Sequence, residues 1–137
     1  MEARLSKFRM SHVKNLLSVA LADEKFHKEE LKFIYQWGER YDLIPDQMDQ
    51  ILKEVDGYHP IIPNSADQRL GQLLDLTRIM LIDGSVDSRE FEFCEKVASG
   101  YGYHKEIIKL LLDYSKSGKN GPEYWALFKD EAKKFLK

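Results

Sequence analysis

Residues 81–91 read LIDGSVDSREF, and a related stretch, LADEKFHKEEL, occupies residues 21–31. In each stretch an aspartate is followed three residues later by an apolar residue and seven residues later by a glutamate. Apolar residues at helical spacing lie on both sides of each stretch. Each stretch is therefore predicted to be a short loop between two helices, and the offset of 60 residues indicates an internal repeat.

The repeat extends beyond these two loops in both directions. The pairs that share the offset are Asp23 and Asp83, Phe26 and Val86, Glu30 and Glu90, Leu16 and Leu76, Ala20 and Met80, Tyr41 and Tyr101, Ile51 and Leu111, and Leu52 and Leu112. The predicted unit is helix, loop, helix, turn, helix, used twice. We place repeat one at about 5–57, a linker at 58–64 and repeat two at about 65–116. A three-helix unit buries its apolar face poorly, so we expect the halves to pack with pseudo-twofold symmetry into one domain, 1–137.

Helical periodicity runs through the rest of the chain, and no strand-like alternation is convincing. The apolar stripes are Val13, Leu16, Leu17, Ala20 and Leu21; Leu31, Ile34, Trp37 and Tyr41; Met48, Ile51, Leu52 and Val55; Leu70, Leu73, Leu74, Thr77, Met80 and Leu81; Phe91, Cys94, Val97 and Tyr101; and Ile107, Ile108, Leu111 and Leu112. A final helix at about 123–136, with Trp125, Phe128, Ala132 and Phe135 on one side, should dock on the others. We therefore predict an all-α bundle of about seven helices.

Composition limits the classes of function. The chain has 137 residues, a net charge of −2 and a single cysteine, Cys94. The charge argues against a nucleic-acid binder, and without a membrane-length apolar run or a signal peptide we expect a cytoplasmic protein. Residues 15–115 carry 11 basic against 19 acidic residues, whereas the two ends carry 10 against 4. The acidic body favours cations or basic protein partners, and the basic ends allow peripheral membrane association; solvated helix faces are the simpler explanation.

The second loop has the residues that end one helix and begin the next. Gly84 suits a left-handed helix end, and Asp87 with Glu90 forms a capping box. Helix ends do not explain Asp83, because a carboxylate at a helix C-terminus meets the unfavourable end of the helix dipole. A cation, a basic side chain or nearby amides should offset its charge.

Oxygen-bearing side chains recur through the same loop. They are Asp83, Ser85, Asp87 and Glu90. Ca²⁺ or Mg²⁺ prefers such ligands, although the loop is shorter than the EF-hand loop of about 12 residues. The first loop keeps Asp23 and Glu30 but has Lys25 and His27 at the intervening positions. We therefore predict an open, weak divalent-cation site formed mainly by the second loop, with helix capping alone as the competing interpretation.

With its paired loops, ADEKFHKEELKFI and LIDGSVDSREFEF, the chain resembles the TerB-like domains, the tellurite-resistance protein B family. That family includes the related N-terminal domain of the membrane-attached DnaJ-like co-chaperone. The resemblance covers about residues 11–115. It implies an all-helical fold with internal pseudosymmetry and a non-enzymatic stress-response role that involves divalent cations or a protein partner. The acidic family positions fall on Asp23, Glu30, Asp83 and Glu90 and the glycine on Gly84, whereas Glu24 departs from the glycine.

Two other functions compete with a binding module. One is a metal-assisted hydrolase, which needs three or more convergent ligands and a general base; His27 with Glu30 is the available pair. The other is a dimerisation or membrane-proximal scaffold, favoured if Trp125, Phe128 and Phe135 are exposed. No HExxH, GxSxG or P-loop pattern occurs, and no cofactor is implied beyond the cation.

Overall fold

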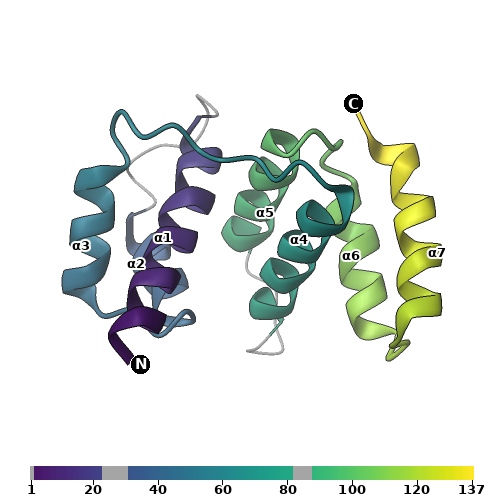
Figure 1. Cartoon of the computed structure of the whole chain (residues 1–137), viewed down its shortest axis with the longest axis horizontal. Helices are drawn as coiled ribbons and strands as arrows, with labels where there is room; N and C mark the ends of the chain where they lie inside the picture. Colours follow the sequence, from purple (N-terminus) through teal and green to yellow (C-terminus); the bar gives the residue numbers. More distant parts are fainter. Residues whose placement is uncertain (1, 23–30, 82–87) are drawn as a thin grey trace. The chain divides into compact units, whose positions relative to one another are not determined.

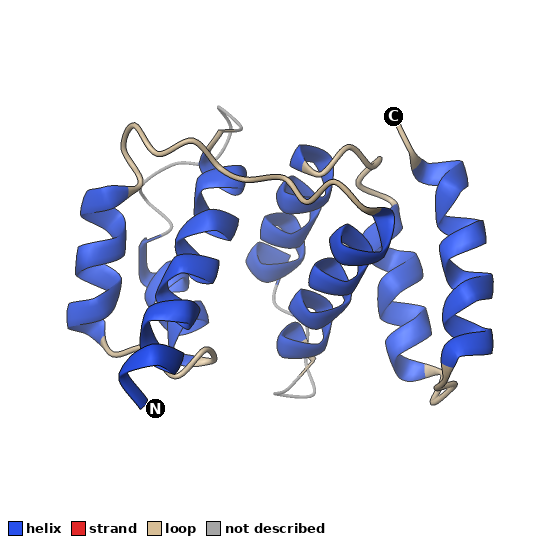
Figure 2. Cartoon of the chain, viewed as in Figure 1, coloured by secondary structure: helices blue, strands red, loops and turns tan. Residues whose placement is uncertain are grey.

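The computed structural model describes residues 2–22, 31–81 and 88–137. This part of the chain contains no β-strand, and one isolated bridge joins Tyr103 to Leu136. The described elements are α1 (Glu2–Leu21), α2 (Leu31–Glu39), α3 (Pro45–Glu54), α4 (Ala66–Met80), α5 (Ser88–Gly100), α6 (Ile107–Lys116), α7 (Pro122–Ala132) and a 3₁₀ turn, η2 (Lys133–Phe135). Figure 1 labels the helices and colours them along the sequence, and Figure 2 distinguishes helices from loops. The predicted all-α fold is confirmed.

The chain divides into two compact units, which we call unit 1 (Met1–Ile61) and unit 2 (Ile62–Lys137). Unit 1 contains α1, α2 and α3, with α3 packed on the other two; unit 2 contains α4, α5 and α6 in mutual contact, and α7. Their boundary lies within the linker predicted at 58–64. The division thus follows the predicted repeats, and the packing of the halves into one domain stays a prediction.

The offset of 60 residues holds for burial as well as for sequence. Both members of each of these pairs are buried: Val13 and Leu73, Leu16 and Leu76, Ala20 and Met80, Phe33 and Phe93, Ile34 and Cys94, Trp37 and Val97, Met48 and Ile108, and Ile51 and Leu111. The first and second helices of each unit therefore present equivalent faces to the interior. The apolar spacing that predicted the helices also selects these faces.

One predicted core position is wrong in detail. Phe91 was placed on the buried stripe of α5, but it is only half-buried, whereas Phe93 is 1% exposed. At the equivalent position of unit 1, Phe33 is 2% exposed. Phe91 and Phe93 are two positions apart and therefore lie on different faces of α5, and Phe93 faces the interior together with Cys94.

The turns after α2 and α5 share one hydrogen-bonding pattern. The Leu43 amide donates to the Gly38 carbonyl at 3.1 Å, and the Tyr103 amide donates to the Ala98 carbonyl at 3.0 Å. The intervening residue has a positive φ in each turn, 60° at Asp42 and 90° at Gly102. These are the bonds and the conformation of a Schellman motif. Gly102 adopts this left-handed conformation without a Cβ, and Asp42 adopts it with a side chain.

The connection between α3 and α4 is fastened near its middle on both sides. In unit 1, Asn15 donates from Nδ2 to the Ile61 carbonyl at 2.9 Å and accepts from the Ile61 amide at 2.7 Å. In unit 2, the Arg69 guanidinium donates to the carbonyls of Pro63 and Asn64, each at 2.8 Å. The side chain of Ile61 nevertheless stays 68% exposed. The backbone, and not an apolar contact of Ile61, therefore holds this segment.

The last helix, α7, docks on α4 and α6 of unit 2. Phe128 is 5% exposed, and its ring centroid lies 4.8 Å from that of Tyr114 and 5.5 Å from that of Trp125. After η2, the Lys137 amide donates to the Gly102 carbonyl at 2.9 Å. The predicted docking helix is confirmed, although it ends as an α-helix at Ala132 because the 3₁₀ turn follows.

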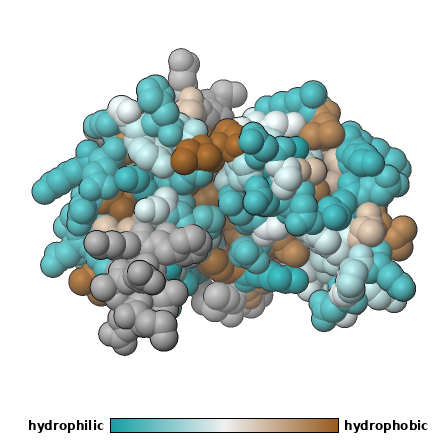
Figure 3. Space-filling view, viewed as in Figure 1, coloured by the Kyte–Doolittle hydropathy of each residue, from teal (hydrophilic) through white to brown (hydrophobic). Residues whose placement is uncertain are grey.

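Polar side chains cover most of the face shown in Figure 3, and apolar ones form small separate groups on it. Among the described residues, no helix has both the length and the apolarity that a bilayer crossing requires. Even α1, with 20 residues, is interrupted by charged side chains.

Candidate functional site

The predicted cation site is only partly within the described residues. Those that lie outside are Asp23, Glu30, Asp83, Ser85 and Asp87. Glu90 is the one predicted ligand whose position is described. The cation site and the capping box therefore both stay predictions, and what can be examined is the frame that holds the second loop.

Glu90 lies in the first turn of α5, directly after residues 82–87, and is 5% exposed. An acidic side chain in this turn suits the positive end of the helix dipole. Burial restricts the side chain to few conformations. This placement suits both a capping residue and a cation ligand.

The helices on either side of residues 82–87 pack against each other. The α4 helix ends at Met80, whose Sδ lies 4.0 Å from the Sγ of Cys94 in α5. Burial raises the pKa of the Cys94 thiol, and the nearby carboxylates of Glu90 and Glu95 raise it further. An uncharged, apolar contact thus joins α4 to α5 near residues 82–87. Cys94 is a buried core residue, as predicted, and its thiol stays protonated.

Metal-binding side chains do not converge elsewhere in the described part of the chain. Within residues 2–22, 31–81 and 88–137, no three His, Cys, Asp or Glu side chains group closely enough to hold a metal ion. The hydrolase hypothesis needs such a group, and His27 and Glu30 lie outside these ranges. The scaffold hypothesis needs an exposed aromatic face on α7; Phe128 is buried and Trp125 and Phe135 are half-buried.

Sequence reasoning missed the role of Asp67 in the first turn of α4. Its Oδ1 accepts from Trp125 Nε1 at 2.9 Å and from Lys129 Nζ at 3.0 Å. The hydrogen bond from Trp125, and then the hydrogen bond and charge of Lys129, lower the pKa of the Asp67 carboxyl. Asp67 therefore joins α7 to α4. No signal in the sequence indicates this contact, because the partners stand 58 and 62 residues away.

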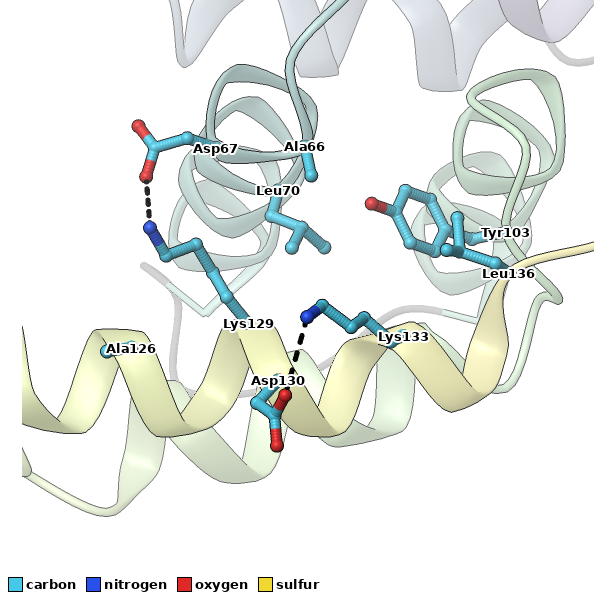
Figure 4. Close-up of a pocket in the computed structure, with 9 residues that line it drawn as sticks. All are labelled: Ala66, Asp67, Leu70, Tyr103, Ala126, Lys129, Asp130, Lys133 and Leu136. Carbon is cyan, nitrogen blue, oxygen red and sulfur yellow. Dashed lines mark hydrogen bonds and ion pairs between the residues drawn. The ribbon is translucent and has the colours of Figure 1, made fainter.

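A pocket beside Asp67 was also not predicted. It has a volume of about 320 Å³ and lies between the start of α4, α7 and the C-terminal segment, all in unit 2. Figure 4 shows the side chains that line it. Leu70 and Tyr103 come from the interior of the unit, and Lys129 and Lys133 from α7 and η2.

The resemblance to TerB-like domains rests on the two loop motifs and their spacing. No family model, curated protein or solved structure matches the chain.

Proposed function

We propose that this chain is a non-enzymatic, TerB-like stress-response module. In this proposal the two acidic loops, 23–30 and 82–87 with Glu90, form the binding surface, and the ligand is a divalent cation or a protein partner. The observation that carries the proposal is the buried Glu90, 5% exposed at the end of the second loop. A fixed carboxylate beside a loop with three further oxygen-bearing side chains suits a hard cation.

The repeat gives the two loops equivalent positions in the sequence of their units. Each follows the first helix of its unit, and the flanking helices bury equivalent positions. The second loop is the better cation ligand, because Lys25 and His27 in the first loop replace Ser85 and Asp87. A lysine beside Asp23 neutralises the charge that a cation would otherwise neutralise. We therefore expect one weak Ca²⁺ or Mg²⁺ site and not two.

Calorimetric titration of the whole chain tests the cation version. Ca²⁺ and Mg²⁺ are titrated into the wild type, Asp83→Asn and the matched variant Asp23→Asn. Binding heat and a raised melting temperature are expected for the wild type and Asp23→Asn, because a ligand of the folded state stabilises it. Asp83→Asn should lose both.

The opposite results would end the cation version. These are an absence of heat and of any melting shift at millimolar cation, or the same heat from Asp83→Asn as from the wild type. The partner version is then tested with a lysine-rich peptide as the probe, because the loops are acidic. Its binding should weaken with added salt and with Asp83→Asn; binding unaffected by both would contradict the proposal.

A further inference from the structure

The pocket of unit 2 has features that the acidic loops do not explain, and it shares no residue with them. Its volume of about 320 Å³ is at the lower end of the range typical of small-molecule sites, roughly 300–1,000 Å³. Leu70, Ala126 and Leu136 contribute apolar surface on three sides. The body of a ligand of about ten heavy atoms would therefore lie against these three side chains.

Tyr103 supplies the polar group inside the pocket. The residue is 1% exposed, and Figure 4 shows its hydroxyl directed toward Ala66 and Leu70. Its oxygen is not among the fully enclosed polar atoms without a partner, so the open side of the pocket gives a ligand access to it. An oxygen of a ligand there would accept the hydrogen bond of the hydroxyl in place of solvent.

The pocket lining carries two aspartates and two lysines, and it is Lys133, with positive charge near Tyr103, that an anionic ligand would meet. Asp67 already accepts two hydrogen bonds through Oδ1, so its charge is largely compensated. Lys133 is held only by a pair with Asp130 at 3.5 Å, and its side chain is 73% exposed, so it can turn to a ligand at little cost. The guanidinium of Arg69 lies over the Tyr103 ring, 5.9 Å from its centroid. The positive end of the α4 dipole, at Ala66, also faces the pocket.

We propose that this pocket binds a small organic acid. The carboxylate or phosphate head accepts a hydrogen bond from the Tyr103 hydroxyl and pairs with Lys133, and the apolar body lies against Leu70, Ala126 and Leu136. The pocket is separate from the acidic loops. A negative result for anion binding in the pocket therefore leaves the cation proposal standing, and the reverse also holds.

Titration of the ¹⁵N-labelled full chain followed by NMR tests this proposal. The probes are 3-phenylpropanoate, phenyl phosphate and, as the opposite charge, 3-phenylpropylamine. At least one of the two anions should produce saturable shifts at the amides of Ala66 and Asp67 and at the indole of Trp125. Comparing the two identifies the preferred head group. The amine should produce none of these shifts.

Three variants complete the test. Tyr103→Phe keeps the ring and should weaken anion binding about tenfold, the effect of losing a hydrogen bond to a charged group, without lowering the melting temperature. Ala126→Leu fills the pocket from an exposed position and should abolish binding. Tyr124→Phe, on an exposed tyrosine outside this pocket, should change nothing. The proposal is overturned if neither anion binds saturably, if the amine binds equally, or if Tyr103→Phe binds like the wild type.

Discussion

At the scale of single residues, the turns after α2 and α5 share a backbone conformation but not a side chain. A positive φ is unfavourable for residues with a Cβ, and Asp42 adopts 60°. Asp42 is also exposed, so its side chain contributes little by burial. We predict that Asp42→Gly raises the free energy of unfolding by about 0.5–1 kcal/mol, measured by urea denaturation.

The equivalent position in unit 2 gives the matched control. No atom lies within 4 Å of a Cβ built on Gly102, so Gly102→Ala meets no steric obstacle. Its cost is conformational and should be about 1 kcal/mol of destabilisation. If Asp42→Gly destabilises the chain as well, the aspartate must make a favourable contact, and the strain argument is wrong.

A second residue-scale prediction concerns two glycines inside helices. A Cβ on Gly38 in α2 would lie 2.4 Å from Met48 Sδ, whereas a Cβ on Gly71 in α4 would meet nothing within 4 Å. Met48 is fully buried, so it has little room to move. Gly38→Ala should overpack this contact and lower the free energy of unfolding by about 1–3 kcal/mol. Its melting temperature should fall accordingly. Gly71→Ala should stabilise by up to about 1 kcal/mol, and the reverse order in thermal denaturation would refute the packing account.

At the scale of elements, the docking of α7 depends on a carboxylate. The pKa of Asp67 is lowered in the folded chain by Trp125 and Lys129. Its contribution is therefore complete above the usual aspartate pKa, ~3.9, and is lost as the pH falls through the lowered folded value. We predict that acid loosens α7 in this window, which the Trp125 indole resonance should report.

Asp67→Asn is the control for that titration. The amide still accepts from Trp125 but does not titrate and does not pair with Lys129. The variant should weaken the docking of α7 at neutral pH and remove the Asp67 component of the acid dependence. A wild-type pH profile in Asp67→Asn would assign the acid sensitivity to other carboxylates.

At the scale of the whole molecule, the connection between the units is held near its middle by hydrogen bonds from each unit. The hydrogen bonds of Asn15 hold Ile61, and those of Arg69 hold Pro63 and Asn64, so Ile62 lies between the two fastened points. Exposed backbone that is released becomes a preferred protease site. We predict that Asn15→Ala and Arg69→Lys each accelerate cleavage within 55–65 by proteinase K, whereas Lys53→Ala, an exposed residue nearby, does not. Equal cleavage rates in all four chains would contradict this.

The helices and the repeat were predictable because their signals are local. Apolar side chains three and four residues apart select one face of a helix, and the offset of 60 marks equivalent faces such as Leu16 with Leu76. The left-handed turn at Gly102 was predictable from glycine alone. Phe91 shares a helical stripe with Cys94 and Val97, so its position on the helix favoured burial, and only its tertiary neighbours decide that it stays half-buried.

The contacts that shape unit 2 could not be predicted for a different reason. Trp125 and Lys129 meet Asp67 across a long separation in sequence, and periodicity carries no information about such pairs. The Tyr103 pocket exists only because η2 and the C-terminal segment return to the turn after α5. For the predicted cation site, Glu90 alone can be assessed, and its burial agrees with both interpretations of the loop.

The only cysteine of the chain offers a consequence for measurement. Cys94 is 2% exposed, lies against Met80 at the base of the second loop, and has a raised pKa. The thiolate is the species that reacts with thiol reagents, so labelling requires α4 and α5 to separate there. The labelling rate therefore reports the rate of local opening, and mass spectrometry can follow it in the unmutated chain. A cation that binds the second loop should lower the labelling rate of Cys94. In Asp83→Asn the same cation should leave the labelling rate unchanged.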